Sequence, residues 1–383
     1  MCLQGHSQWL NSPSGVSSSV QSVYFTDVNT GYASCNGGSI LKTTNQGASW
    51  TLQTSGTTND LFELNFPAPD TGYGVGYLGT IVKTTDGGVS WTTLNSGTNL
   101  QFNSVWFTDV NTGYAAGGSG SLSIELIMKT TDGGATWVQQ TNGTSKQLSG
   151  IHFPAVDTGY AVGNQGVILK TTNGGLNWVP QSSGTPQLLR SVFFTDVNTG
   201  YAVGTAGKII KTTDGGQTWV SQTSGTTQTL FSVYFINSTN GYASGNSGTI
   251  LRTTDSGVTW TPEVSGTTAD LYFIHFVNGS AGFTSGTGGT IRRTQLSTGI
   301  NPPGDSPVSL LFNNAISDRL QFELPEGELK GVLKIYNSSG RLLRMVQCAS
   351  SVDIDVSEWS SGVYYMEVQT DSRKWREKFI KMK

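Results

Sequence analysis

The carboxylates of this chain are the residues best suited to catalysis, and Glu63 occupies an unusual place among them. It falls in a column of a repeated pattern where the other repeats have Ser, Gly or Phe. Asp60 lies three residues before Glu63, and Asp270 holds the place equivalent to Asp60 in another repeat. Two carboxylates separated by about 5 to 10 Å can hydrolyse a glycosidic bond. Glu63 with Asp60 or Asp270 is therefore a candidate catalytic pair, and solvated surface carboxylates are the alternative interpretation.

Most other acidic residues before residue 296 recur at fixed places in the repeats. The segment KTTDGGQTW, residues 211–219, occurs six times with small changes. In such a loop the Asx side chain accepts backbone N–H bonds, glycine allows positive φ, and the tryptophan packs on the sheet. Because Asn replaces Asp in two copies, the role is hydrogen bonding and not proton transfer. We expect these residues to be structural: Asn45, Trp50, Asp86, Trp91, Asp132, Trp137, Asn173, Trp178, Asp214, Trp219, Asp255 and Trp260.

Histidine, cysteine and arginine form no further catalytic or metal-binding pattern. The three cysteines lack metal-ligand spacing, and we expect the three histidines to be packing residues. A sialidase would need three arginines around the substrate carboxylate and an activated tyrosine. The repeat region has four arginines, and Arg252 among them replaces a repeated lysine. We therefore predict no metal site and no cofactor, and we do not expect sialidase activity.

Composition excludes two classes of partner. The net charge is -3 and 12% of the residues are charged, so no basic field is available to neutralise nucleic-acid phosphates. No run of about 18 apolar residues occurs, so we predict no transmembrane segment. Glycine accounts for 50 of 383 residues, which favours many short strands joined by tight turns.

The spacing of the repeats predicts the fold. The repeated tryptophans fall at residues 50, 91, 137, 178, 219 and 260. A period of about 40 residues with several strand-like runs is typical of one β-propeller blade per repeat. Counting back 41 residues from Trp50 reaches Trp9, whose strand would complete the seventh blade and hide two free sheet edges. We predict an all-β chain with a seven-bladed propeller over residues 1–295, closed by the N-terminal strand.

The loop residues also carry a family resemblance. Thr212, Asp214, Gly216, Thr218 and Trp219 resemble the Asp-box, S-x-D-x-G-x-T-W. Together with GYAVG, the 41-residue unit resembles the repeats of the photosystem II assembly and stability factor family. Asp-box propellers also occur in sialidases, xyloglucan hydrolases and sortilin-type receptors, so the resemblance implies the fold and leaves the function open.

The C-terminal part has a different pattern. We assign residues 296–307 to a Pro/Gly/Ser-rich linker and residues 308–383 to a small antiparallel β-sandwich. The segments LKIYNSSGRLL (333–343), IDVSEWSSGVYYMEV (354–368) and the terminal KFIKMK resemble the C-terminal sorting domain of the type IX secretion system of Bacteroidetes. A generic Ig-like module is the alternative interpretation.

The second resemblance implies a location. The type IX secretion machinery would recognise residues 308–383, and the protein would reside outside the cell or on the outer-membrane surface. Such export also needs an N-terminal Sec signal, but MCLQGHSQWL lacks the basic start and apolar stretch of one. We expect the chain either to be a fragment or to begin downstream of the true start.

Binding is easier to support than catalysis. The loops between blades, and those between the second and third strands, form one face of a propeller. A five-residue insertion around Ser119 to Glu125 breaks the repeat on that face, and loops that depart from a rigid scaffold favour specific contacts. We predict a secreted or cell-surface, non-enzymatic module for a protein or polysaccharide, with a glycoside hydrolase and an assembly-factor-like scaffold as alternatives. The candidate binding residues are Tyr77, Leu78, Trp106, Ser119, Glu125 and Arg190.

Overall fold

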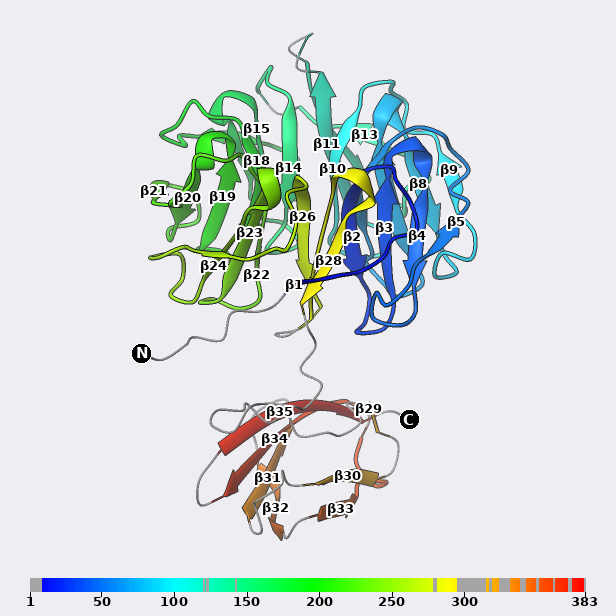
Figure 1. Cartoon of the computed structure of the whole chain (residues 1–383), viewed down its shortest axis with the longest axis vertical. Coiled ribbons are helices and arrows are strands. Elements are labelled where there is room, and N and C mark those ends of the chain that lie inside the picture. The colour runs from blue at the N-terminus through cyan, green and yellow to red at the C-terminus, as the bar shows by residue number, and fades with distance from the viewer. Residues whose placement is uncertain are drawn as a thin grey trace. The chain divides into compact units, whose positions relative to one another are not determined.

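The chain forms two compact units, residues 1–296 and 297–383, in a computed structural model (Figure 1). The structure describes residues 9–119, 121, 124–141, 143–277, 281–294, 315–316, 319–323, 331–337, 342–348, 351–360, 362–370 and 374–381.

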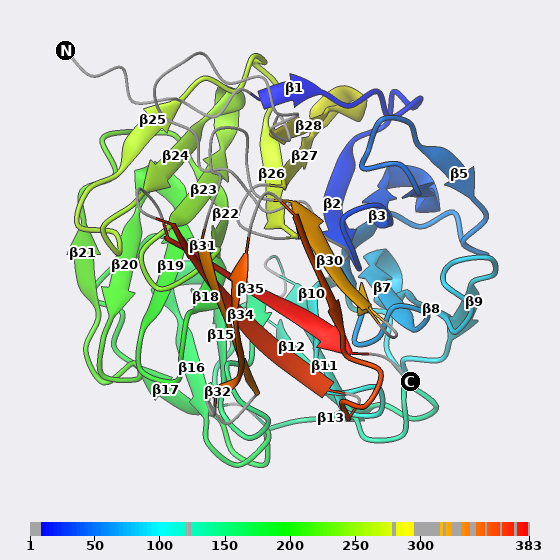
Figure 2. The ribbon, with the colours of Figure 1, turned by 90° about the horizontal axis from the view of Figure 1, so that it is seen from below.

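The described residues of the first unit form seven four-stranded antiparallel sheets, which stand in a ring as the blades of a propeller (Figure 2). From the inner to the outer strand, blade 1 is β2 (Val20–Phe25), β3 (Gly31–Cys35), β4 (Ile40–Thr43) and β5 (Thr51–Gln53); blade 2 is β6 (Leu61–Asn65), β7 (Gly72–Gly76), β8 (Ile81–Thr84) and β9 (Thr92–Leu94); blade 3 is β10 (Phe102–Phe107), β11 (Gly113–Ser119), β12 (Ile124–Thr130) and β13 (Val138–Gln139); blade 4 is β14 (Leu148–His152), β15 (Gly159–Gly163), β16 (Ile168–Thr171) and β17 (Val179–Gln181); blade 5 is β18 (Leu189–Phe194), β19 (Gly200–Gly204), β20 (Ile209–Thr212) and β21 (Val220–Gln222); blade 6 is β22 (Leu230–Phe235), β23 (Gly241–Gly245), β24 (Ile250–Thr253) and β25 (Thr261–Glu263); blade 7 is β26 (Leu271–Phe276), β27 (Gly282–Gly286), β28 (Ile291–Thr294) and β1 (Trp9–Asn11).

The two faces of the ring carry different connections. The upper face has the loops between blades and the short 3₁₀ turns that join second to third strands. The lower face has the turns between first and second strands and the Asp-box loops. The 3₁₀ turns are η1 (Asn36–Gly38), η2 (Tyr77–Gly79), η3 (Asn164–Gly166), η4 (Thr205–Gly207), η5 (Asn246–Gly248) and η6 (Thr287–Gly289).

The second strand of each blade explains the repeated GY dipeptide. In blade 5 every residue of β19 is buried, because the strand pairs along both edges and is covered on both faces. A Cβ added to Gly200 would lie 2.5 Å from a ring carbon of Phe194. Glycine is therefore required at the start of this strand by the close approach of the neighbouring aromatic ring.

The N-terminal strand closes the ring as predicted. β1 pairs antiparallel with β28 in the register Trp9 to Thr294, which completes blade 7. The Trp9 ring packs edge-on against Tyr242 at 6.4 Å and Phe276 at 6.1 Å between ring centroids. The closing strand thus carries a buried aromatic anchor between blades 6 and 7.

A two-donor clamp joins neighbouring blades on the lower face. The Tyr201 hydroxyl and Lys211 Nζ of blade 5 both donate to the carbonyl of Ser256 in the next Asp-box loop, each at 2.8 Å. Burial raises the pKa of Tyr201 to about 12, so the hydroxyl remains a donor at neutral pH. The same clamp joins Tyr32 and Lys42 to Gly87, Tyr73 and Lys83 to Gly133, Tyr114 and Lys129 to Gly174, and Tyr160 and Lys170 to Gly215.

The junction between blades 7 and 1 keeps half of this clamp. Phe283 takes the place of the tyrosine and has no hydroxyl, whereas Arg293 takes the place of the lysine. The Arg293 guanidinium donates to the Gln46 carbonyl at 3.0 Å. The lower-face contact is therefore kept with one donor instead of two.

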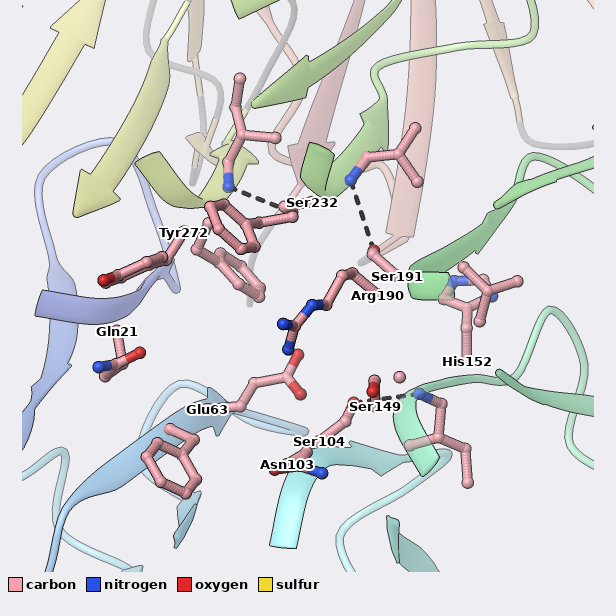
Figure 3. Close-up of a pocket in the computed structure, with 18 of the residues that line it drawn as sticks. Gln21, Glu63, Asn103, Ser104, Ser149, His152, Arg190, Ser191, Ser232 and Tyr272 are labelled. Atoms are coloured by element: carbon pink, nitrogen blue, oxygen red, sulfur yellow. Dashed lines mark hydrogen bonds between the residues drawn. The ribbon is translucent and has the colours of Figure 1, made fainter. Parts of the chain in front are cut away.

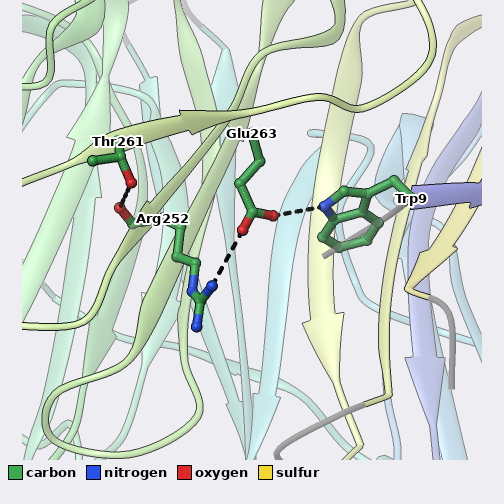
Figure 4. A network of polar contacts seen from close by, with 4 residues as sticks. All are labelled: Trp9, Arg252, Thr261 and Glu263. Atoms are coloured by element: carbon green, nitrogen blue, oxygen red, sulfur yellow. Dashed lines mark hydrogen bonds and ion pairs between the residues drawn. The ribbon is translucent and has the colours of Figure 1, made fainter. Parts of the chain in front are cut away.

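The junction between blades 6 and 7 uses a different contact, because β1 follows no Asp-box loop. Glu263 Oε2 accepts a 3.0 Å hydrogen bond from Trp9 Nε1 (Figure 4). Its other oxygen lies 3.6 Å from Arg252, and the Glu263 side chain is 1% exposed. A buried carboxylate thus links the closing strand to the outer strands of blade 6.

The Asp-box loops are held by their own side chains. Asp214 Oδ1 accepts the Thr212 hydroxyl at 2.8 Å and the Thr218 N–H at 2.9 Å, while Oδ2 accepts the Thr218 hydroxyl at 2.6 Å. These bonds, led by the one from the Thr218 hydroxyl, lower the pKa of Asp214 to about 2. Asn173 makes the corresponding bond to the Asn177 N–H at 3.0 Å. The acid serves as an acceptor that fixes a turn.

The second unit is also built from strands. β29 (Ala315–Ile316), β31 (Gly331–Asn337), β32 (Leu342–Cys348), β34 (Gly362–Thr370) and β35 (Lys374–Lys381) form one sheet, and β30 (Arg319–Glu323) pairs with β33 (Ser351–Asp355). The pairs are antiparallel except β29 with β35. The all-β prediction is confirmed for both units. No helix in the described part of the chain has the length and apolarity needed to cross a membrane.

Candidate functional site

The channel enclosed by the seven inner strands contains a cavity of about 730 Å³. Three rings of side chains line it, because a β-bulge after the first residue of each inner strand exposes both the second and the third position. We call the second-position residues, nearest the upper face, the mouth ring: Gln21, Phe62, Asn103, Ser149, Arg190, Phe231 and Tyr272.

The third-position ring fastens blades to one another. Ser104 Oγ accepts the backbone N–H of Ile151 in the next blade at 3.1 Å (Figure 3). Glu63 does the same through Oε2, which accepts the Val105 N–H at 3.0 Å. The corresponding bonds run from Leu64 to Ser22, from Val233 to Ser191 and from Ile274 to Ser232.

Burial sets the protonation of Glu63. It raises the pKa of this carboxyl to about 7, against the opposing effect of hydrogen bonds from Ser104 and Val105. A carboxyl that titrates near neutrality can act as a general acid. Its bond to the Val105 N–H also matches the structural role of the serines in the same ring.

Asp60 and Asp270 hold turns of the preceding blades. Asp60 Oδ1 accepts the Gly37 N–H in η1 at 2.7 Å, and Asp270 Oδ1 accepts the Ser247 N–H in η5 at 2.8 Å. Each aspartate therefore has a structural partner on the upper face. The pairing of either with Glu63 in hydrolysis stays a prediction.

The fifth-position residues form the floor ring: Tyr24, Asn65, Trp106, His152, Phe193, Tyr234 and His275. The aromatic and imidazole rings of this floor ring contact one another in series from blade 3 round to blade 1. The ring centroids of Trp106 and His152 lie 4.3 Å apart, and those of His275 and Tyr24 lie 4.8 Å apart. Burial lowers the pKa of His152 to about 3 and that of His275 to about 4. Both imidazoles are neutral at physiological pH and pack as expected, although His152 Nδ1 and His275 Nε2 lack a hydrogen-bond partner among the described residues.

Arg190 is the cation of the mouth ring. Its guanidinium lies over the Phe231 ring at 5.6 Å, and Phe231 meets Tyr272 edge-on at 5.2 Å. Arg190 and Glu63 come from blades 5 and 2 and point toward one another into the channel (Figure 3). Among the described residues, no carboxylate lies within ion-pair distance of Arg190.

The other predicted binding residues have several locations. Trp106 lies in the floor ring, so both Trp106 and Arg190 line the cavity. Tyr77 and Leu78 lie in η2 on the upper face, 48% and 51% exposed, outside that lining. Ser119 and Glu125 lie on the hairpin of β11 and β12, where residues 120, 122 and 123 of the insertion are outside the described residues.

Sequence reasoning missed the mouth ring apart from Arg190. The signal was available in the repeats, because the second position changes from Gln to Phe, Asn, Ser, Arg and Tyr while the sixth position is Phe in every blade. A position that varies between copies of one scaffold is free of a shared packing role. The bulge that turns it into the channel is a tertiary feature.

Comparisons with known proteins identify the propeller. A family model for the photosynthesis system II assembly factor YCF48 matches residues 43–141, 135–221 and 171–261, which together span more than half of the chain. The chain belongs to this family. A model for the secretion system C-terminal sorting domain matches residues 311–382. Both predicted resemblances are confirmed. The second indicates export to the cell surface or the extracellular space through the type IX secretion machinery.

Solved structures show the same propeller fold. YCF48 from Cyanidioschyzon merolae has a TM-score of 0.64 and 19% identity, over 75% of this chain and 98% of its own. YCF48 bound to D1 peptide has a TM-score of 0.65 and 18% identity, over 76% and 96%. An ancestral GH74 enzyme has a TM-score of 0.59 and 14% identity, over 98% of this chain and 64% of its own. No curated protein sequence matches the chain. At these identities the likeness concerns the fold alone.

Proposed function

We propose that this chain is an exported, non-catalytic binding protein that holds a polysaccharide or protein ligand at the upper mouth of its channel. The main support for this proposal is the mouth ring, where the repeats differ in residue type around a cavity of about 730 Å³. A concave site with aromatic walls and a few polar groups on a rigid scaffold is the usual form of a binding site. The sorting domain supports a location where such ligands are met.

Glycoside hydrolysis is the second candidate, and the raised pKa of Glu63 favours it. Two features favour binding instead. Glu63 accepts a backbone N–H from the next blade, and Asp60 and Asp270 are each engaged by a turn. These contacts support a structural role for all three carboxylates.

An assembly-factor-like role is a form of protein binding. A family member has been solved as YCF48 bound to D1 peptide, which supports a protein ligand as one option for this propeller. Ser119 and Glu125, the described residues at the ends of the insertion, lie on the hairpin of β11 and β12 outside the cavity lining.

The test is an array of polysaccharides, glycans and peptides probed with the purified chain, reading retained binding and released sugar in parallel. We expect retention without release, and loss of retention when mouth-ring side chains are truncated. Sugar release that disappears in Glu63→Gln would instead establish a hydrolase.

A further inference from the structure

Several backbone N–H and C=O groups on the channel edge of the inner strands already form hydrogen bonds with side chains of the preceding blade. The Leu64 N–H donates to Ser22, the Phe107 N–H donates to Asn65, and the Phe66 carbonyl accepts the Tyr24 hydroxyl at 3.2 Å. A peptide that binds by adding a strand needs free N–H and C=O groups along such an edge. These engaged groups cannot pair with an added strand, which favours recognition by side chains.

The mouth ring and Glu63 of the third-position ring offer those side chains on two opposed walls. On one wall, Arg190 is held over Phe231, and Phe231 abuts Tyr272 edge-on. On the other wall is Glu63, which points toward Arg190 (Figure 3). A ligand between the walls meets a guanidinium, an aromatic surface and a carboxyl acceptor.

The charge pattern selects among ligands. Arg190 has no ion-pair partner in the described part of the chain, and a guanidinium binds carboxylates through two parallel hydrogen bonds. An aromatic surface beside it suits a ring with an apolar face, and the Glu63 carboxyl suits a hydroxyl donor. A sugar acid combines a carboxylate, hydroxyls and an apolar ring face in one unit.

We propose that the mouth ring, together with Glu63 of the third-position ring, binds a uronic acid residue of an acidic polysaccharide. Arg190 pairs with the uronate carboxylate, Phe231 and Tyr272 pack against the sugar ring, and Glu63 accepts a hydroxyl. This assignment rests on the proposed binding function and names its ligand class. The cavity of about 730 Å³ has the volume of small-ligand sites, which accommodates a short segment of one chain.

The experiment measures affinity by calorimetry with the purified chain at low salt. The probes are trimers of galacturonate, glucuronate and mannuronate, their methyl esters, and a glutamate-rich peptide of equal charge. We expect at least one acidic trimer to bind, with its methyl ester about tenfold or more weaker because the ester removes the charge-assisted bonds. Arg190→Gln should weaken the acid by a similar factor and abolish the difference between acid and ester.

Lys208→Gln is the matched control. Lys208 directly follows η4 in the same blade as Arg190, and its substitution removes one positive charge without changing a residue of the cavity lining. It should leave the affinity unchanged, and Tyr272→Ala should weaken acid and ester equally. Three results would overturn the proposal: equal affinity for acid and ester, unchanged affinity of the Arg190→Gln variant for the acid, or no binding by any trimer. Binding of the peptide alone overturns it too. If the uronic acid proposal fails but the array retains neutral polysaccharides or proteins, the proposed binding function still holds.

Discussion

The lower face and the channel mouth are built from the same seven repeats but use them differently. On the lower face, tyrosine and lysine of one blade clamp an Asp-box carbonyl of the next, with the same partners at five junctions. At the mouth, the second residue of the inner strand changes in type from blade to blade.

The difference separates stability from recognition. The contacts that join blades recur at most junctions, because the repeats give those junctions similar geometry. The mouth-ring residues share no such repeated contact, although Asn103 donates to the Leu148 carbonyl of the next blade, and their types can therefore suit a ligand. Both junctions of blade 7 differ. Between blades 6 and 7, Glu263 links Trp9 and Arg252, because the closing strand follows no Asp-box loop. Between blades 7 and 1, Arg293 is the clamp donor and Phe283 replaces the tyrosine.

The largest expected effect comes from an Asp-box tryptophan. Trp219 is 9% exposed and packs edge-on against Phe194 at 5.9 Å. Trp219→Ala should lower the free energy of unfolding by about 3–5 kcal/mol, because it leaves a cavity between two blades. Denaturant unfolding measures the change. Phe231→Ala, a mouth-ring truncation, should cost about 1 kcal/mol; equal losses for the two variants would erase the distinction between the regions.

The ring closure should show the next largest effect. Glu263→Ala removes the acceptor of Trp9 Nε1 and the partner of Arg252, and should lower the free energy of unfolding by about 2–4 kcal/mol. Gln222→Ala changes the equivalent position of blade 5 and should cost much less. If both variants unfold at the same denaturant concentration, Glu263 does not stabilise the closure.

Glu63 should make stability depend on pH. Its pKa rises from 4.5 to about 7 on folding, so the unfolded chain loses this proton first as pH increases. The contribution of Glu63 to stability therefore falls between about pH 4.5 and 7 and is level above that range. Glu63→Gln should gain about 1–3 kcal/mol relative to the wild type at pH 8 compared with pH 5. A constant difference between the two proteins at both pH values would contradict the assigned burial effect.

The smallest expected effect concerns one donor of a clamp. Tyr201→Phe should cost about 0.5–1.5 kcal/mol, since Lys211 still donates to the Ser256 carbonyl. Phe283 provides a natural precedent, because that junction relies on Arg293 alone. The double change Tyr201→Phe with Lys211→Met should cost more than the sum of the single changes, as it leaves the carbonyl unpaired. Simple additivity in unfolding experiments would show that the two donors act independently.

Periodicity was enough to predict the propeller and its closure. Trp9 lies 41 residues before Trp50, and the pairing of Trp9 with Thr294 follows from completing the last blade. The structural role of the Asp-box acids followed from the exchange of Asp for Asn at residues 45 and 173. These inferences needed only local rules, because each blade repeats the same turns and strands.

The residues of the candidate site were harder to predict from the sequence than the fold. The sequence singled out four residues that line the cavity, Glu63, Trp106, Arg190 and Asp270. Tyr77 and Leu78 lie outside the cavity lining, and most of the mouth ring was not foreseen. The sequence identified the carboxylates but did not give their hydrogen-bond partners. Asp60 bonds to η1 and Asp270 to η5, each in the preceding blade, and contacts between blades cannot be read from the repeat pattern.

The repeat, the propeller, its closing strand and the sorting domain were predictable from the chain alone, because each is marked by residue types at regular spacing. That Arg190 faces Glu63 across the channel follows from the folded ring. The two residues are 127 positions apart, and they meet because the ring brings blades 2 and 5 to opposite walls of one cavity.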